Sequence, residues 1–407
     1  MKRPLPWPPS RPDRPVPTCP GRLLSRRDFL ARAAVGAAAL PAAFSAGAAP
    51  RAVTAIGACR RYELGEVRRV LAVLFDELGG LGRLVRDRHV TVKANLVNTS
   101  QEDLSGVPLE LAVTVHPVVA LALGRLLVEA GARQVVFAEQ LPFRAPDEEA
   151  FAGYGFHLAR FSAVMEGRVR FANTRNRGPH GGYARVEVPG GGELASAWEV
   201  NRTYVDTDVL VSLTKLKSHV SAGITAGMKN LFGIPPSSLY GEDLAGEPDE
   251  DAIGYRNDTM HACTRKPLTS ADWFTGRSVE GDHGFNVPRF IVDLTAAFPV
   301  QLVVIDAVST IQAAEGWWLG SMVTLTRPGL LIAGLNPVCT DAVAAAVMGF
   351  DPEAPDRQWP FVNGTNYLAL ARHRGLGENR ISELDVAGLD LARARCQFQP
   401  TYRRTAP

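Results

Sequence analysis

Two patterns of hydrophobic residues alternate along most of the chain. Short runs of consecutive apolar residues are typical of buried strands, and apolar residues three or four positions apart are typical of helices. The strand pattern covers residues 89–93, 134–138, 208–213, 301–306 and 330–335, and the helical pattern covers residues 116–130, 286–298 and 337–348. This alternation predicts βαβ units, and therefore an α/β fold whose mostly parallel sheet is flanked by helices.

Two stretches interrupt this rhythm. Residues 166–200 contain two segments of alternating polarity and three consecutive glycines, which predicts a β-hairpin inserted on the sheet. Residues 237–282 are polar and rich in acidic side chains, so we expect a long loop there. A solvated surface excursion is the favoured interpretation, and a flap over a substrate is the alternative. We expect residues 49–395 to form one α/β domain and residues 396–407 a tail.

The first 48 residues differ from everything that follows. Eight prolines among residues 1–20 prevent a packed core, so we expect disorder there. The motif Ser25-Arg26-Arg27-Asp28-Phe29-Leu30 precedes an Ala- and Gly-rich stretch that is too short for a transmembrane anchor. This arrangement resembles a twin-arginine export signal. It implies passage through the twin-arginine translocase, a periplasmic or extracellular location, and no stable membrane span in the mature chain.

Removing the signal changes the charge of the chain. The whole sequence of 407 residues has 44 basic and 42 acidic residues. Residues 1–48 hold eight of the basic and two of the acidic ones, so the mature chain carries more negative than positive charge. The apparent basicity therefore belongs to the signal, and a nucleic-acid partner is not expected.

The cysteines also exclude some functions. No C-x-x-C pair occurs, which argues against a zinc ribbon or an iron–sulfur cluster. Cys339 opens an apolar helical pattern and is expected to be a buried thiol. A disulfide between Cys59 and Cys263 or Cys396 stays open.

Lysine is rare in this chain, and its positions are informative. Only 6 lysines accompany 38 arginines. Unlike Arg, Lys is a compact charge whose pKa falls readily on burial. Lys93 and Lys215 lie at or just beyond the ends of predicted strands, and Lys217 and Lys229 lie in the Gly-rich segment that follows the second one. Ligands of open α/β sheets bind beyond the carboxyl ends of the strands. The pattern therefore predicts a crevice for a small anion, a carboxylate or a phosphate, with chance placement as the alternative.

The remaining polar residues near these strand ends complete the predicted site. The catalytic candidates are Lys217, His219 and His283, with an imidazole as general acid or base. The substrate-binding candidates are Lys93, Asn95, Lys215, Thr225, Lys229 and Asn230. Three acidic residues either orient the imidazoles or hold a metal ion, and the identity of any cofactor stays open. They are Asp306, Glu315 and Asp341.

Several collinear motifs resemble one known family. They are V-K-A-N-L-V at 92–97, H-P-V-V-A-L-A-L-G-R-L-L-V-E-A-G-A at 116–132, K-L-K-S-H-V-S-A-G-I-T-A-G-M-K-N-L-F-G at 215–233, I-V-D-L at 291–294, V-I-D-A-V at 304–308 and N-P-V-C-T-D-A-V-A-A-A-V-M-G at 336–349. Together they are similar to the domain of unknown function 362 (DUF362) family. Some members of that family carry a ferredoxin-like iron–sulfur module, whose cysteines this chain lacks. The family pattern also has Pro where Ala94 stands.

Three functions fit these observations. The first is an exported enzyme that acts on a small anionic substrate in a crevice lined by Lys and His. The second is a periplasmic ligand-binding or cofactor-carrier protein that uses the same crevice without turnover. The third is an assembly factor whose polar loop, residues 237–282, contacts a partner.

Overall fold

A computed structural model describes most of the chain. The described residues are 52–97, 103–104, 106–141, 147–175, 183–241, 256–267, 276–316 and 323–403. They belong to one compact unit, Ala46–Pro407. The expected export signal lies outside the described residues, as does the end of the expected tail.

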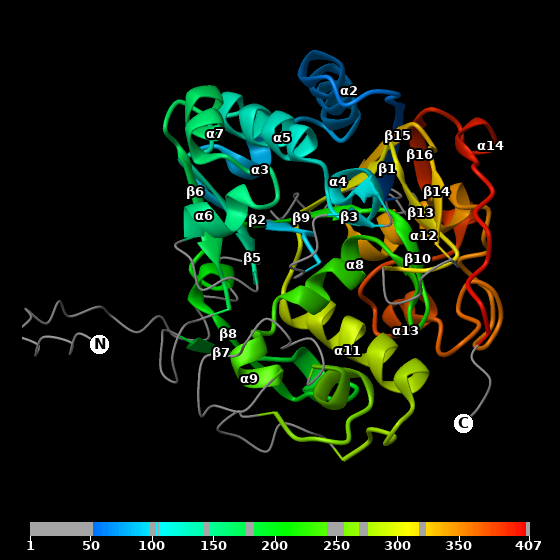
Figure 1. Ribbon diagram of the computed structural model, residues 1–407. Coiled ribbons are helices and arrows are strands. Elements are labelled where there is room, and N and C mark those ends of the chain that lie inside the picture. The colour runs from blue at the N-terminus through cyan, green and yellow to red at the C-terminus, as the bar shows by residue number, and fades with distance from the viewer. Residues whose placement is uncertain are drawn as a thin grey trace, which may run out of the picture. The chain divides into compact units, whose positions relative to one another are not determined.

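An eight-stranded sheet forms the centre of this unit (Figure 1). Its strands β12, β9, β2, β5 and β6 run parallel to one another, and β15 runs antiparallel to both of its neighbours, β1 and β12. The prediction of a mostly parallel α/β sheet is therefore confirmed. In spatial order the strands are β16 (Asp385–Gly388), β1 (Val53–Ala58), β15 (Leu330–Gly334), β12 (Leu302–Ala307), β9 (Val209–Lys215), β2 (His89–Ala94), β5 (Gln134–Glu139) and β6 (Val169–Asn173).

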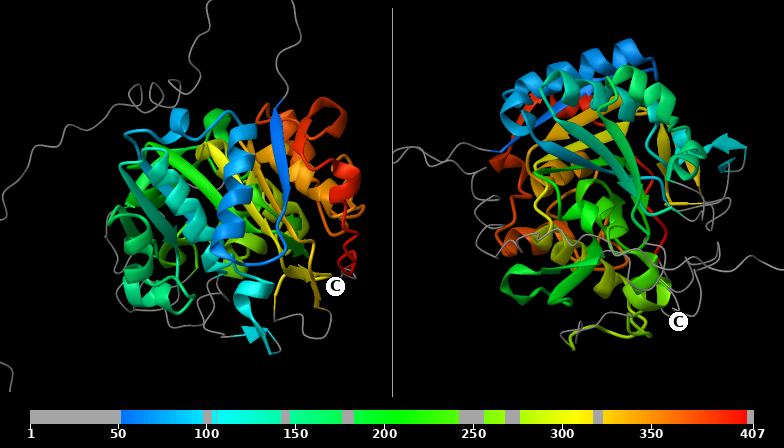
Figure 2. Two further views of the ribbon diagram at one scale, coloured as in Figure 1. Left: turned by 90° about the horizontal axis from the view of Figure 1, so that it is seen from above. Right: turned by 90° about the vertical axis from the view of Figure 1, so that its left-hand side faces the viewer.

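Helices cover both faces of the sheet (Figure 2). Successive strand residues point to opposite faces, so Val211 and Leu213 belong to one apolar core and Leu210 belongs to the other. The first core is covered by α2 (Leu64–Glu77), α3 (Gly82–Val85), α5 (Pro117–Glu129), α6 (Asp147–Ala152) and α7 (Leu158–Val164). The second core is covered by α8 (Gly227–Asn230), α11 (His283–Ala297), α12 (Pro337–Val347), α13 (Tyr367–His373) and α14 (Leu391–Ala394).

The helices begin where the sequence provides caps. Pro117 opens α5, and the His116 side chain accepts a hydrogen bond from the Val118 amide. Pro337 opens α12, and the Asn336 side chain accepts from the two amides that follow this proline. A first-turn proline has no N–H to leave unsatisfied, and the preceding side chain satisfies an orphan donor.

Short elements surround the sheet. Two-stranded ribbons are formed by β3 (Asp103–Leu104) with β4 (Val107–Pro108), β7 (Tyr183–Glu187) with β8 (Ala197–Asn201), β10 (Lys217–His219) with β11 (Gly223–Thr225), and β13 (Thr310–Gln312) with β14 (Thr324–Thr326). The short helices are α4 (Leu109–Ala112), α9 (Ser237–Tyr240) and a π-helix at Asn257–His261, together with 3-10 turns at Pro189–Gly191, Arg202–Tyr204, Leu231–Gly233 and Ile381–Glu383.

The structure corrects two expectations about the interruptions. A hairpin is present, but it joins β7 to β8, whereas residues 169–173 form the edge strand β6 of the main sheet. Of the described parts of residues 237–282, the segments with Tyr240, Arg256 and Met260 pack into the domain because these side chains are buried, whereas residues 276–281 are largely exposed. Backbone that folds into α9 and a π-helix satisfies its own polar groups, which allows this burial.

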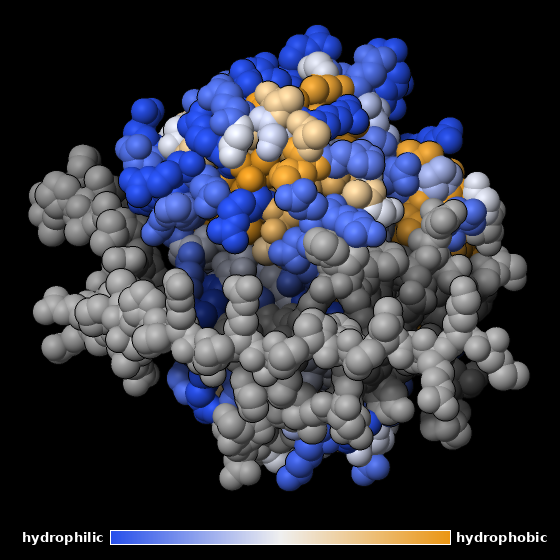
Figure 3. All heavy atoms as spheres, turned by 60° about the vertical axis from the view of Figure 1, so that its left-hand side comes forward, coloured by the Kyte–Doolittle hydropathy of each residue, from blue (hydrophilic) through white to orange (hydrophobic). Residues whose placement is uncertain are grey.

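Hydrophilic side chains are interspersed with smaller apolar areas on the face shown in Figure 3. Among the described residues, no helix has the length and apolar character needed to span a bilayer.

A buried carboxylate joins the β7–β8 hairpin to α11. Asp293 accepts hydrogen bonds from the backbone amides of three consecutive residues in the hairpin connection, Glu193, Leu194 and Ala195. Burial raises the pKa of Asp293 to about 6. The connection comes this close because Gly192 has a φ of +64°, and a Cβ at that position would lie 3.0 Å from Asp293 Oδ1.

We expect Asp293→Asn to lower the free energy of unfolding by about 1–3 kcal/mol, because the new amide N–H₂ replaces an acceptor that faces backbone donors. Urea denaturation measures this change. Asp385→Asn, at an exposed position on β16, is the matched control and is expected to leave stability unchanged. Equal stability of the two variants would contradict this account of the hairpin.

Candidate functional site

Four charged residues meet at one edge of the sheet because their strands are parallel. Lys93, Glu139, Lys215 and Asp306 lie at the carboxyl ends of β2, β5, β9 and β12. They form two ion pairs, with 2.8 Å between Lys93 Nζ and Glu139 Oε1 and 2.7 Å between Lys215 Nζ and Asp306 Oδ2. All four side chains are buried, so these charges depend on one another.

The Lys215–Asp306 pair is saturated with protein partners. Lys215 Nζ also donates to the carbonyl oxygens of Glu110 (2.8 Å) and Ser309 (3.1 Å) and to the Tyr62 hydroxyl (3.1 Å). The Tyr62 hydroxyl donates to Asp306 Oδ1 at 2.9 Å. An ammonium group has three protons to donate, so this lysine has none left for a ligand.

The Lys93–Glu139 pair is tied to α8. Lys93 Nζ lies 3.4 Å from Asn230 Oδ1, and Asn230 Nδ2 donates to the Lys93 carbonyl oxygen at 3.0 Å. Glu139 Oε2 also accepts from the Leu96 amide at 3.0 Å. A Cβ on Gly233 would approach Lys93 Nζ to 2.7 Å, so glycine there allows the chain to pass over the ion pair. The Asn230 side chain is therefore engaged by other groups of the protein, contrary to its predicted role in substrate binding.

The two pairs lie on opposite faces of the sheet. Lys93 contacts Asn230 of α8, whereas Lys215 contacts Tyr62, just before α2, and Glu110 of α4. The expectation of a single crevice that includes all four lysines is therefore not met. Successive residues of a strand point to opposite faces of the sheet. The positions of Lys93 and Lys215 in their strands therefore place the two side chains on different faces.

Lys217 and Lys229 differ from the paired lysines. Lys217 is 3% exposed, and its Nζ donates to one carbonyl oxygen, that of Val113, at 2.9 Å. Lys229 is partly exposed, and its Nζ lies 4.1 Å from the centre of the Phe232 ring. No carboxylate oxygen in the described part of the chain lies within 4.0 Å of either Nζ. Both ammonium groups are thus buried or half-buried, and neither has a counter-ion among the described residues.

Burial and neighbouring cations weaken the proton affinity of both lysines. Burial lowers the pKa of Lys217 to about 7, and the charge of Glu315 opposes this shift. Burial also lowers the pKa of Lys229 to about 7, with further contributions from the charges of Arg256, Lys217 and Lys93. Lys229 therefore lies within electrostatic range of a group of cations.

Buried polar atoms without partners lie on the same segments. Asn95 Oδ1, Ser218 Oγ and Thr225 Oγ1 make no hydrogen bond within the described residues. Thr225 lies opposite Lys217 in the pairing of β10 with β11. Asn95 binds, through its carbonyl, the amide of Val115, two residues beyond the carbonyl that Lys217 uses. Such atoms are rare in folded proteins and indicate an additional partner.

The three acidic candidates hold different parts of the fold. Asp306 is paired with Lys215, as described above. Glu315 Oε2 accepts a hydrogen bond from the Val220 amide at 2.7 Å. Asp341, on α12, accepts from the amides of Gly227 (2.7 Å) and Met228 (2.9 Å) at the start of α8. In the described ranges no three His, Cys, Asp or Glu side chains are grouped to hold a metal ion. The structure thus does not bring these acids together as ligands.

The histidines differ in which nitrogen is engaged. His219 Nδ1 accepts from the amides of Ser221 and Ala222, both at 3.2 Å, so the ring proton of the neutral form is on Nε2. His283 begins α11, and its ring centre lies 5.7 Å from that of His261. His261 is a residue that sequence reasoning missed, because it lies in a polar segment without a periodic pattern.

The sequence analysis also missed Glu139, Tyr62 and Arg256. A usable signal existed for Glu139, since a carboxylate directly follows the apolar run 134–138, next to the strand that ends with Lys93. Tyr62 and Arg256 had no comparable signal.

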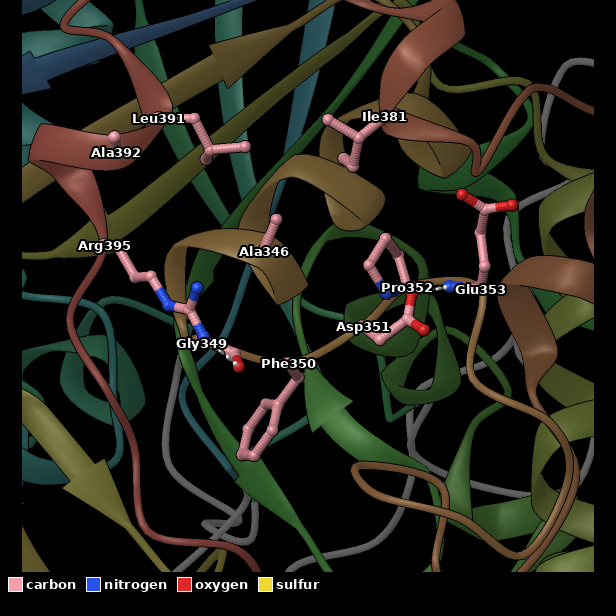
Figure 4. A pocket seen from close by; sticks show the side chains of 10 residues that line it. All are labelled: Ala346, Gly349, Phe350, Asp351, Pro352, Glu353, Ile381, Leu391, Ala392 and Arg395. Atoms are coloured by element: carbon pink, nitrogen blue, oxygen red, sulfur yellow. Dashed lines mark hydrogen bonds between the residues drawn. The ribbon is translucent and has the colours of Figure 1, made fainter.

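A pocket of about 620 Å³ lies elsewhere, between the end of α12 and α14 (Figure 4). None of the predicted site residues lines it. Its lining residues are Ala346, Gly349, Phe350, Asp351, Pro352, Glu353, Ile381, Leu391, Ala392 and Arg395.

Paired and unpaired lysines are expected to respond differently to the same substitution. Lys93→Met leaves the Glu139 charge buried and unpaired, which is expected to lower the free energy of unfolding by about 3–5 kcal/mol. Lys217→Met removes a buried charge that has no counter-ion, so the change is expected to stay within about 1 kcal/mol. Urea denaturation of both variants checks this. A loss in Lys217→Met as large as in Lys93→Met would contradict the distinction.

The chain is similar to one curated protein over part of its length and to several solved structures. Thylakoid-associated protein sll1697 from Synechocystis sp. is 30% identical over 185 residues, which cover 44% of this chain and 49% of that protein. This chain therefore matches about half the length of that curated relative. The lactate racemase apoprotein from Thermoanaerobacterium thermosaccharolyticum aligns at 14% identity with a TM-score of 0.36, over 70% of this chain and 54% of that one. A structure of a Thermotoga maritima protein aligns at 16% identity with a TM-score of 0.34, over 62% and 52% of the two chains.

The chain also matches a protein family. The family described as "Domain of unknown function (DUF362)" matches residues 90–346, which is more than half of the chain. This range contains the strands β2, β5, β9 and β12, the two ion pairs, and the segment with Lys217 and Lys229. It also contains the motifs 92–97, 116–132, 215–233, 291–294 and 304–308, which confirms the resemblance seen in the sequence. The chain belongs to the DUF362 family.

Proposed function

We propose that this chain is an enzyme that acts on a small anionic compound, a carboxylate or a phosphate, held by Lys217 and Lys229. One observation supports this proposal above all others. Two buried or half-buried ammonium groups have no carboxylate partner within the described residues, although Lys93 and Lys215 at the same edge of the sheet are fully paired. A buried charge without a partner is unfavourable, and an anionic ligand removes that penalty.

The charge balance around Lys229 favours an anion. Three further cations, Lys93, Lys217 and Arg256, all act on Lys229, whereas among the groups that shift its pKa Glu315 is the one carboxylate. Glu139 is already paired with Lys93. Among the described residues, positive charge therefore exceeds negative charge at this place, while the mature chain as a whole has an excess of acidic residues. Such a local excess attracts and holds small anions.

Each site residue receives a role in this proposal. Lys217 and Lys229 bind the anionic oxygens, and the unpartnered Thr225 Oγ1 and Asn95 Oδ1 hydrogen-bond the rest of the substrate. His219 is the candidate general acid, and its neutral ring carries the proton on Nε2 because Nδ1 accepts from backbone amides. His283 lies beside His261. The proposal assigns no metal ion to Asp306, Glu315 and Asp341, since each binds a separate protein partner.

We also propose that the protein is exported by the twin-arginine translocase and acts in the periplasm or outside the cell. The support is the Ser25–Leu30 motif with the apolar stretch that follows it, in residues outside the described part of the chain. A ligand-binding or carrier protein that uses the same site without turnover is the alternative function. It shares the binding predictions below and differs in showing no chemical change of the ligand.

Lys217→Met is expected to weaken the binding of sulfate and succinate by about 10- to 100-fold, because it removes charge-assisted hydrogen bonds that contribute about 1.5–3 kcal/mol. Titration calorimetry with the full-length chain measures the dissociation constants. Lys266→Met is the matched control, because Lys266 is exposed and lies outside the cation group. Equal binding by the two variants would refute an anion site at Lys217.

Affinity for both probes is expected to fall as the pH rises above 7. The pKa values of Lys217 and Lys229 are about 7, so below this pH both lysines are charged, and above it they lose the charge that binds the anion. For each lysine the charged fraction falls about tenfold per pH unit, and the dissociation constant rises accordingly. Sulfate and succinate stay fully ionised from pH 6.5 to 9, so the slope reports the protein. A flat profile, or an unchanged slope in Lys217→Met, would contradict this assignment.

A further inference from the structure

His261 is held rigidly next to the cation group. It is the last residue of the π-helix Asn257–His261, and its ring centre lies 5.1 Å from that of Phe232. Lys229 Nζ lies 4.1 Å from the centre of the same ring. Asn286, on α11, donates to the His261 carbonyl oxygen at 2.9 Å. A π-helix is rare and frequently occurs at functional sites.

The hydrogen bond of the ring determines where its proton is. His261 Nδ1 lies 3.2 Å from the carbonyl oxygen of Arg256. A carbonyl oxygen only accepts, so Nδ1 must carry the proton and Nε2 has a lone pair. Nε2 makes no hydrogen bond to any residue that the structure describes.

The surroundings of His261 keep this lone pair available. Burial lowers the pKa of His261 well below its usual value, and the charges of Lys229, His283 and Arg256 add to this shift. These groups come from α8, α11 and the start of the π-helix, which are the elements packed around the ring. Among the described residues no carboxylate contributes to this lowering of the pKa, which favours the neutral imidazole.

The ring of His219 is arranged differently from that of His261. His219 uses Nδ1 to accept from two backbone amides, so its Nε2 presents a proton rather than a lone pair. The neutral rings of His219 and His261 are therefore opposite tautomers. At Nε2, His219 therefore presents a donor and His261 an acceptor, the two functions that acid–base catalysis uses.

We propose that His261 is the general base of this site and that its Nε2 takes a proton from a C–H group next to the anionic group of the substrate. The inference rests on the proposed function, because it requires an anion bound at Lys229. In the step, the C–H bond breaks, its electron pair stays on the substrate, and a new N–H bond forms on His261. The ammonium group of Lys229 stabilises the negative charge that develops. The substrate class is thus a carbon acid that carries a carboxylate or a phosphonate.

Hydrogen exchange with solvent tests this step without knowledge of the natural substrate. The full-length chain is incubated in D₂O with succinate, malonate or phosphonoacetate, each of which has a CH₂ bonded to an anionic group, and deuterium incorporation is followed by proton NMR against a protein-free sample. Titration calorimetry gives the affinity of each probe. His261→Asn keeps an amide N–H that can donate to the Arg256 carbonyl oxygen but removes the Nε2 lone pair. His373→Asn, at an exposed position on α13, is the matched control.

The expected result is exchange of at least one bound probe above the protein-free rate. His261→Asn is expected to slow that exchange by about 100-fold or more while its affinity for the probe changes by less than about threefold. His373→Asn is expected to behave as the unmodified chain. Exchange that persists in His261→Asn, or a bound probe that never exchanges, would overturn the role of His261 alone. Failure of all three probes to bind would instead overturn the anion site, and this inference with it.

A second measurement needs no ligand. In a nitrogen-15 NMR spectrum of labelled histidines, the His261 ring is expected to show a protonated Nδ1 and an unprotonated Nε2 from pH 6 to 8. His261→Asn identifies the signal. A charged ring, or the opposite tautomer, would exclude His261 as the base.

Discussion

The buried ion pairs at the carboxyl ends of the parallel strands are the constraint on which the rest of the site depends. Parallel strands end together, so charged residues that follow them are brought into a space where water is largely excluded. Lys93 with Glu139 and Lys215 with Asp306 neutralise each other there, at 2.8 and 2.7 Å. Removing either partner would leave a buried charge, so each pair also holds its neighbouring strands and the segments bound to them in one arrangement.

The proposed function depends mainly on Lys217 and Lys229, which have no carboxylate partner among the described residues. Four lysines follow the strands of this sheet edge and carry the same charged group. Protein acceptors saturate Lys93 and Lys215, but not Lys217 and Lys229. Lys217 donates to a single carbonyl oxygen, and Lys229 lies on an aromatic ring. This contrast is the basis of the proposed anion site, because the fold supplies a carboxylate to Lys93 and to Lys215.

The sequence predicted five strands of the main sheet and the helices α5, α11 and α12, missed β1, β16 and α2, and predicted the site in part. Apolar periodicity is a local property, so β9, β12 and α12 were recognisable from the residues themselves. The face to which Lys93 and Lys215 point depends on the register between strands, which a single strand does not contain. Glu139 lies one residue beyond the apolar run that marked its strand. His261 gave no signal, because a π-helix in a polar segment has no hydrophobic period that a pattern can detect.

The short helix α8 shows how the fold combines structure and binding in four residues. A helix of this length is not stable by itself, since nucleation costs more than its few hydrogen bonds return. Asp341 accepts from the amides of Gly227 and Met228 at its start, and Asn230 donates to the Lys93 carbonyl oxygen at its end. Both ends of α8 are therefore bound by protein groups, and Lys229, between these anchors, lies over the Phe232 ring. An element held this firmly keeps the Lys229 charge in place before a ligand arrives, which is what electrostatic stabilisation of a developing anion requires.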